Sequence, residues 1–390
     1  MPNILEAAYL RARCASIFTA CGSSTEEAEK VAANLVMANL SGHDSHGVGM
    51  VPRYVEAILE GGLQPNATVK TLLDAGSLLT LNGQRGFGQV IGEQAMVLGI
   101  EKAKANGSCI MALAESHHLG RIGNFAEMAV AQGLVSLHFV NVKSRPVVAP
   151  WGGSDGRYGT NPCCIGIPLM GELKRQTISS MEAESASAGP PQTRPASSRG
   201  REDTLVPNLQ AQHFILDFAT SVVAQGKMRV AHNQGKAVQP GLLIDEHGKP
   251  TTNPGVVVEP QPNGFFGALM PFGGHKGYGL AVACELLGGA LTGGGTWHQP
   301  SPNGRAVINS MLTILIDPVK LGTQAAFEAE ALAFVDWLRL SPPGEGFDAV
   351  QIAGEPERRA RQQRERDGIE IDEHTWKEII DAAGKVGLKM

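Results

Sequence analysis

The sequence has little of what marks several large classes of protein. Its formal net charge is -5, so nothing attracts the chain to phosphate backbones or anionic lipid. The six cysteines show no paired CxxC spacing, which argues against a zinc ribbon or a disulfide framework. Charges interrupt the apolar stretch at the amino terminus, unlike a secretion signal, and no later apolar run reaches the ~18 residues that span a bilayer. We therefore expect a protein of the reducing cytoplasm, without nucleic-acid or membrane partners.

Glycine, by contrast, is abundant, with 48 residues in a chain of 390. Such a content indicates many tight turns and many close approaches of the backbone to other groups. At roughly 100 to 200 residues per domain, this length predicts two or three structural units.

The hydrophobic pattern predicts an α/β protein. Ser24 and Glu27 form a capping box, after which apolar residues recur at helical spacing up to the segment SGHDSHG. Strand-like runs are expected at 78–83, 110–114, 135–142, 164–168, 214–218 and 311–316, with helices at 89–105 and 277–291. Near the carboxy terminus, EPERRARQQRERDG is typical of a solvated helix, and WKEIIDAAGKVG of a final helix that packs back on the body.

Residues 171–212 differ in composition from the rest, with mostly serine, proline, alanine and scattered charges. Such a mixture cannot bury enough apolar surface to offset the entropy of ordering. Strand-like runs lie on both sides of the segment. We therefore interpret it as a disordered insert within the middle of the chain.

A first glycine-rich motif, GFGQVIG at 86–92, follows a strand and opens a helix, as a dinucleotide-binding loop would. Its spacing is GxGxxxG, however, and no acid ends a second strand about 20 residues later. The motif favours a structural turn.

The segment GHDSHGVGMVPRY sets His43 and His46 among short polar residues and glycines just past a helix end. Short polar side chains can orient an imidazole, and glycine lets a ligand approach the backbone. Metal ligation by His43, His46, His117 and His118 is a competing interpretation, although no matching cysteine or carboxylate spacing accompanies them.

Further glycine-rich segments follow in the middle of the chain. In ESHHLGRIGNFAEMA, a turn presents backbone amides and one cation near a helix start, which suits a phosphate; a histidine that merely caps a turn is the alternative. APWGGSDGRYGTNP, FILDFATS and MPFGGHKGYGLA are three more turns of small residues. Together they carry Asn161, Asp217, His275 and Lys276 toward a common ligand.

Taken in order, these motifs resemble the second, non-Rossmann malate/L-lactate dehydrogenase family, which includes ureidoglycolate dehydrogenase, diketogulonate reductase and sulfolactate dehydrogenase. The resemblance runs from GHDSHGVGMVPRY to AGEPE and includes EHGKPTTNP. It implies a mainly helical domain built from both chain ends, 1–75 and 318–390, and a non-Rossmann α/β cofactor domain with a mixed sheet at 76–317. It also implies NAD or NADP as cofactor and a homodimer. The insert at 171–212 departs from the family pattern.

The resemblance also implies roles for individual residues. His46 matches the catalytic histidine, Asp217 the acid that works with it, and His118 a second active-site histidine. Together with Asn161 and Lys276 from the glycine-rich turns, the expected cofactor contacts are His46, Gly120, Arg121, Ile122, Asp217, Phe218, Ala219, Thr220, Ser221, His275, Asn309, Gly354, Glu355, Pro356 and Glu357. No metal is expected in this interpretation.

The substrate candidates are Ser45, Met50, Arg53 and Arg121. Many family members carry an arginine where this chain has Met50, and Met50 followed by VPRY resembles the hydroxycarboxylate dehydrogenase branch, whose members accept larger, partly aromatic oxo acids such as hydroxyphenylpyruvate. We therefore expect hydride transfer between NAD(P) and a bulky 2-hydroxy/2-oxo acid pair, with proton exchange at His46. Alternatives are a malate/lactate-type or ureidoglycolate-type dehydrogenase, a His-rich metal-dependent hydrolase or lyase, and a non-catalytic binding protein.

Overall fold

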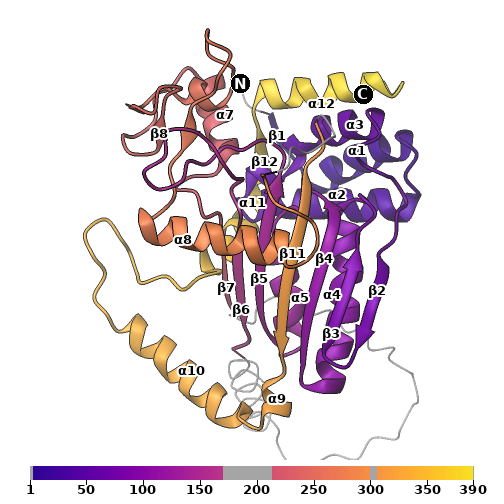
Figure 1. Ribbon diagram of the computed structural model, residues 1–390, viewed down its shortest axis with the longest axis vertical. Coiled ribbons are helices and arrows are strands. Elements are labelled where there is room, and N and C mark those ends of the chain that lie inside the picture. Colours follow the sequence, from indigo (N-terminus) through magenta and orange to yellow (C-terminus); the bar gives the residue numbers. More distant parts are fainter. Residues whose placement is uncertain (1–2, 170–212, 299–304, 390) are drawn as a thin grey trace, which may run out of the picture.

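The structure, a computed structural model, describes residues 3–169, 213–298 and 305–389. Figure 1 shows strands running the length of the molecule, with a group of helices at the end where both chain termini lie. The insert expected at 171–212 lies outside the described residues. No helix in the described ranges has the length and apolar character needed to cross a membrane.

The helical end is built from both ends of the chain. Its helices are α1 (Ala7–Ala20), α2 (Thr25–Leu40), α3 (Val51–Leu59) and α12 (Glu373–Lys385), and β1 (Asn3–Leu5) pairs antiparallel with β12 (Ile369–Ile371). The hydroxyl of Ser24 accepts a hydrogen bond from the backbone N–H of Glu27, as the capping box predicts. Leu10, Leu35 and Ile379 are fully buried in the shared core, so α12 packs back on the body as expected.

The centre of the molecule is a sheet in the order β2-β3-β4-β11-β5-β6-β7. Its strands are β2 (Lys70–Ala75), β3 (Leu78–Asn82), β4 (Ser108–His117), β5 (Val135–Lys143), β6 (Cys163–Ile167), β7 (Phe214–Phe218) and β11 (Ile308–Ile316). Within this sheet β3 and β4 are parallel and the other neighbouring pairs are antiparallel. The sheet is therefore mixed, unlike the parallel sheet of a Rossmann fold. Together with the helical end, it confirms the predicted fold class.

Helices cover the sheet and hold its loops in place. The helices α4 (Gly88–Asn106) and α5 (Gly123–Ala131) pack on one face, whereas α8 (His275–Cys284) and the π-helical turn η4 (Glu285–Ala290) cross the other. A Cβ on Gly88 would lie 2.2 Å from the carbonyl oxygen of His118. Gly88 of the motif GFGQVIG thus allows α4 to approach the end of β4 closely, and the interpretation of the motif as a structural turn stays a prediction.

A smaller lobe lies beside the helical end. It contains α7 (Gln225–Asn233), the 3₁₀ turn η3 (Pro254–Val257) and a sheet in the order β10-β8-β9, formed by β8 (Leu243–Ile244), β9 (Pro250–Thr251) and β10 (Ala268–Leu269). Its buried residues, such as Met228 and Val257, form a separate core. These strands are too short to have shown a hydrophobic period in the sequence.

The remaining helices are α9 (Pro318–Leu321), α10 (Gln324–Arg339) and α11 (Glu355–Asp367). Figure 1 shows α10 at the end of the sheet opposite α1 and α12, where its Val335 packs with Leu169 and Ile352. The predicted helix at EPERRARQQRERDG is present as α11. It is not merely solvated, since Arg361 and Arg364 form ion pairs with other elements. The domain boundaries expected at 75/76 and 317/318 stay a prediction.

Candidate active site

His46 lies in a short connection whose shape is fixed by α2. The connection consists of two 3₁₀ turns, η1 (Asp44–His46) and η2 (Val48–Met50). The side-chain amide of Asn39, in the last turn of α2, donates to Asp44 over 2.7 Å and accepts from the backbone N–H of Val48 over 2.8 Å. A Cβ on Gly47 would lie 2.1 Å from the amide oxygen of Asn39. Only glycine fits at position 47. The close packing of Gly47 on Asn39 therefore fixes the backbone next to His46.

His46 stands at one end of a chain of hydrogen bonds that runs into the protein. Its Nδ1 lies 3.3 Å from Nε2 of His118, and the two rings stack with their centroids 5.3 Å apart. Nδ1 of His118 lies 2.6 Å from the hydroxyl of Tyr54, to which Nε2 of Gln89 donates over 2.7 Å. His118, Tyr54 and Gln89 are buried, while His46 is partly exposed. The arrangement links one accessible imidazole to three groups shielded from water.

Burial keeps this chain of groups neutral. Burial lowers the pKa of His46 to about 4, against the opposing effect of the negative charge on Asp217. It also holds the pKa of His118 well below its ordinary value, and raises the pKa of Tyr54. At neutral pH the free protein therefore presents a neutral His46, which can accept a proton.

Asp217 acts on His46 through its charge. It lies in β7 and accepts a hydrogen bond of 2.7 Å from the backbone N–H of Gly123, at the start of α5. A carboxylate is stabilised at a helix amino terminus by the helix dipole and by free N–H groups. Among the described residues no hydrogen bond joins Asp217 to His46, so the two residues expected to work together interact at longer range.

Arg121 lies in the turn before α5 with part of its guanidinium unused. Its Nη2 bonds to Glu127 over 2.9 Å, and Glu127 also accepts a 2.5 Å bond from Arg361. The Nε and Nη1 atoms of Arg121 are buried and have no hydrogen-bond partner within the described ranges. Gly120, next to it, has a φ of +75°, a conformation that favours glycine. Buried donors without partners are costly, so these atoms suit a polar ligand group.

Asn161 and Asn309 are buried and their side chains serve the protein itself. The amide of Asn161 donates to Glu285 over 2.8 Å and accepts from the N–H of Val142 over 3.1 Å. Asn309 accepts from the N–H of Leu119 over 2.8 Å, which positions the turn next to His118. Both residues therefore shape the loops around the site, and their expected contact with the cofactor stays a prediction.

The loop after β7 is held in the same way. Thr220 is fully buried and donates to the carbonyl of Asn161 over 2.9 Å, while Ser221 donates to the carbonyl of Val223 over 2.8 Å. Phe218 packs edge-on against Phe272 with ring centroids 5.4 Å apart. Ala219, which follows Phe218 in the sequence, is partly exposed. A ligand would thus meet mainly the backbone of this loop.

The remaining cofactor candidates are more accessible. His275 and Lys276 are exposed at the start of α8, where His275 lies 6.4 Å from the ring of Trp151. Gly354, with a φ of +95°, precedes the partly exposed Glu355 and exposed Pro356 at the start of α11. One oxygen of Glu357 lies 3.2 Å from Nε2 of His43, and its other oxygen is buried without a partner among the described residues.

The four histidines named as possible metal ligands are not gathered around one point in the described part of the chain. His43 pairs with Glu357, and Nε2 of His117 accepts from the backbone N–H of Val307 over 3.3 Å. In the ranges that the structure describes, no group of three His, Cys, Asp or Glu residues is placed to hold a metal ion.

The substrate candidates lie on two sides of His46. Met50 is partly buried against the helical core, and Arg53 donates from Nε to the carbonyl of Arg305 over 3.2 Å. Ser45 lies against α7. A Cβ added to Gly226, in the first turn of that helix, would be 2.6 Å from the Cβ of Ser45. Arg121 lies beside Asp217, and its charge acts to lower the pKa of His46.

Sequence reasoning missed Tyr54, Gln89 and Arg229 as candidate functional residues. Gln89 lies inside the motif dismissed as a turn, and Tyr54 follows the substrate candidate Arg53. Tyr54 and His118 are 64 positions apart, so no local pattern reveals their contact.

Comparison with known proteins relates the whole chain to one group. Residues 5–178 and 205–380 match the family model described as malate/L-lactate dehydrogenase. Hydroxycarboxylate dehydrogenase B of Escherichia coli is 42% identical, over 96% of this chain and 91% of that protein. L-lactate dehydrogenase of Cupriavidus necator is 37% identical, over 90% and 89% of the two chains. A solved structure of a malate/lactate dehydrogenase-type protein from Escherichia coli superposes with a TM-score of 0.83 at 41% identity, and covers 99% of this chain and 96% of its own.

Proposed function

Because the chain belongs to the malate/L-lactate dehydrogenase family, we propose that it is a 2-hydroxy acid dehydrogenase that uses NAD or NADP. The observation that carries the proposal is the hydrogen-bonded row from His46 through His118 and Tyr54 to Gln89. Alcohol oxidation needs a group that takes a proton as hydride leaves the adjacent carbon, and a neutral, accessible imidazole meets that need.

The residues around the row fit a nicotinamide cofactor. The unpartnered N–H groups of Arg121 and of Arg358 suit phosphate or carboxamide oxygens, and the unpartnered oxygen of Glu357 suits a ribose hydroxyl. His275 and Lys276 add accessible donors at the start of α8. When bound, the cofactor accepts or supplies the hydride. The proposed contacts remain the full set expected from the family motifs, with Asn161 and Asn309 acting by positioning loops.

The row of hydrogen bonds sets which nitrogen of His46 holds a proton. With the amide nitrogen of Gln89 toward Tyr54, the hydroxyl donates to Nδ1 of His118, whose Nε2–H then donates to Nδ1 of His46. The proton of His46 is then on Nε2. A half-turn of the Gln89 amide reverses every bond and leaves a lone pair on Nε2. We propose that this reversed order is the form that accepts the hydroxyl proton during oxidation, with Asp217 stabilising the resulting imidazolium.

The substrate we propose is a bulky or aromatic 2-oxo acid, such as hydroxyphenylpyruvate, with its 2-hydroxy counterpart. Met50 replaces the arginine found at this position in many relatives, and a flexible thioether suits an apolar substrate side chain. Ser45, Arg53 and Arg121 are the polar groups proposed to face the acid. A malate- or lactate-type substrate is the alternative within the family.

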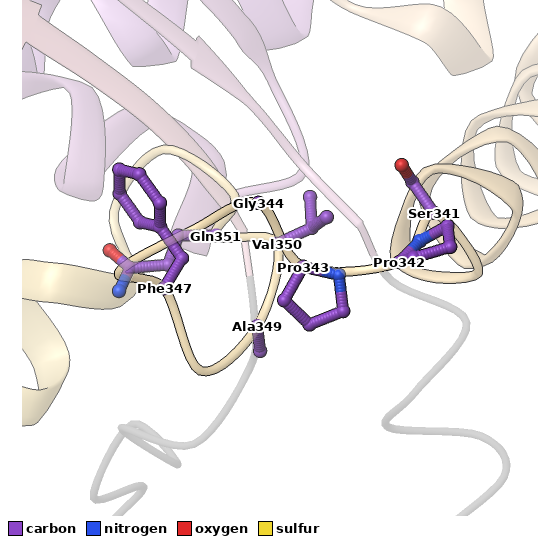
Figure 2. A pocket seen from close by; sticks show the side chains of 8 residues that line it. All are labelled: Ser341, Pro342, Pro343, Gly344, Phe347, Ala349, Val350 and Gln351. Carbon is purple, nitrogen blue, oxygen red and sulfur yellow. The ribbon is translucent and has the colours of Figure 1, made fainter.

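The enzyme is further proposed to be a cytoplasmic homodimer. Phe334 (54% exposed) and Trp337 (65%) lie on α10, Leu340 (79%) follows its last residue, and the next loop adds Phe347 (68%). This loop lines a hollow of about 460 Å³, and Figure 2 shows its lining side chains, among them Pro343, Phe347 and Val350. Large apolar side chains that are exposed together often mark an interface, so a second copy is proposed to cover them. Sedimentation velocity of Trp337→Glu should show a weakened dimer, whereas Phe265→Glu, at an equally exposed residue elsewhere, should leave the dimer unchanged.

The test of the function is the oxidation of NADH and NADPH by metal-free protein with a panel of 2-oxo acids. We expect turnover with at least one cofactor, most efficiently with phenylpyruvate-like acids. Consumption of the acid without oxidation of either cofactor, and only with an added divalent cation, would favour the metal-dependent hydrolase or lyase class. Cofactor binding without turnover of any oxo acid would favour a binding protein.

A further inference from the structure

The helix α7 lies directly against the segment that carries His46. The absence of a side chain at Gly226 lets α7 touch Ser45, the neighbour of His46. Three residues along the same helix, Nη2 of Arg229 comes to within 3.4 Å of the position of a Cβ on Gly49. The guanidinium of Arg229 therefore lies beside the backbone that leads from His46 to Met50.

No acidic residue among those the structure describes neutralises Arg229. It has no hydrogen bond or ion pair there, although it is only partly exposed. Nearby Arg53 bonds through Nε to a carbonyl, and the neighbouring carboxylate of Glu56 is already engaged by Arg305 and Lys385. Burial lowers the pKa of Arg53, and the positive charge of Arg229 acts in the same direction. The two partly buried cations thus lie close enough for the charge of one to act on the other, and in the part of the chain that the structure describes neither has a carboxylate as a hydrogen-bond partner.

These cations lie on the side of the site where the histidines are. Arg53 precedes Tyr54, which bonds to His118, and the charge of Arg53 helps to lower the pKa values of His117 and His118. The other candidate cation, Arg121, also acts on His46 and keeps two N–H groups for a ligand, but Glu127 already balances its charge. A carboxylate that arrived near His46 would therefore gain most from the unpaired guanidiniums.

We propose that Arg229 and Arg53 bind the carboxylate of the 2-oxo acid, and so replace the arginine that the chain lacks at position 50. This inference rests on the proposed function and makes it more specific. A guanidinium can bind both carboxylate oxygens at once, which fixes the orientation as well as the position of the acid. With the carboxylate held on the α7 side, the adjacent C2 oxygen is directed toward His46, and Met50 is left free for the apolar part of the substrate.

The kinetic test is Arg229→Met. We expect the KM for phenylpyruvate to rise about 10- to 100-fold, the loss usual for a charged hydrogen bond, with the KM for the cofactor unchanged. Arg229→Lys keeps the charge but loses the paired geometry, so its KM should be intermediate. Lys227→Met, which removes the same charge from an exposed position on the same helix, should behave as wild type. In Arg229→Ala, added guanidinium ion should restore part of the lost efficiency.

Calorimetric titration with phenylpyruvate separates this inference from the proposed function. Wild-type binding that is lost in Arg229→Met but retained in Lys227→Met supports the assignment, even if no turnover is found. Binding without turnover would overturn the proposed dehydrogenase activity alone. Equal affinity of wild type and Arg229→Met, equal rises in both KM values, or no binding of phenylpyruvate by the wild type would overturn the assignment of Arg229.

Discussion

Replacing Tyr54 with phenylalanine removes the link between His118 and Gln89 and little else. The hydroxyl makes a 2.6 Å contact with His118 and a 2.7 Å contact with Gln89, and both are buried. The ring itself packs against Phe18 and Phe87, with centroids 6.2 Å and 5.9 Å away, and phenylalanine keeps those contacts. The substitution therefore tests the hydrogen bonds without opening a cavity.

The expected cost has a structural part and a catalytic part. A buried polar group left without its partner costs about 1–3 kcal/mol, so the free energy of unfolding should fall by roughly that amount. His118 also loses the group that selects its protonated nitrogen. A hydrogen bond that orients a proton-transfer group and is worth about 1.5–3 kcal/mol corresponds to a fall in kcat of about 10- to 150-fold. The KM for the cofactor should not change, because Tyr54 lies behind His118.

Initial rates at saturating cofactor and urea unfolding measure the two parts separately. Tyr9→Phe is the matched control, since Tyr9 is exposed and its hydroxyl has no hydrogen bond to the described residues. A Tyr54→Phe protein with the kcat and the pH profile of the wild type would refute the role of the hydrogen-bonded row in proton transfer.

Three further predictions concern charge and substrate choice. Burial lowers the pKa of His138 to about 3, below its value near 6.5 in the unfolded chain. The unfolded chain therefore binds more protons as the pH falls, so this contribution to stability is fully present well above pH 6.5 and falls by about 2 kcal/mol between pH 6.5 and 4.5. Urea unfolding at both pH values checks this, and His138→Asn should reduce the loss. Asp217→Asn should lower the pKa of His46 further and slow oxo-acid reduction at neutral pH about tenfold, as measured by initial rates at saturating cofactor. Met50→Arg should shift kcat/KM from phenylpyruvate toward pyruvate and oxaloacetate, because an aromatic side chain would desolvate the new charge; an unchanged ratio would mean that residue 50 does not face the substrate.

The elements that could be predicted are those with a local signal. The capping box at Ser24 and the apolar strands 78–83 and 135–142 appear close to their expected places, because period and turn residues determine such elements. The two-residue strands β8 and β10 could not be predicted, since two residues are too few to show a hydrophobic period.

The residues of the site also fall into two groups, those that a local motif marks and those that it does not. The histidines could be selected from glycine-flanked motifs, which mark close approach of a ligand. Tyr54 and Gln89 carry no such mark, and their part depends on burial and on contacts across 64 and 35 positions. Asn161 shows the converse, because its motif pointed to a ligand whereas its amide holds the loops together.

The central claim is that the protein transfers a hydride between a 2-hydroxy acid and a nicotinamide cofactor. The transfer of a deuterium label tests it most directly. Phenyllactate deuterated at C2 would be incubated with the protein and the oxidised cofactor, and the reduced cofactor analysed by mass spectrometry. Direct hydride transfer predicts that the deuterium appears on the nicotinamide ring, and that His46→Ala loses about 100- to 10,000-fold of the rate. Deuterium released into water, or turnover without reduction of the cofactor, would contradict it.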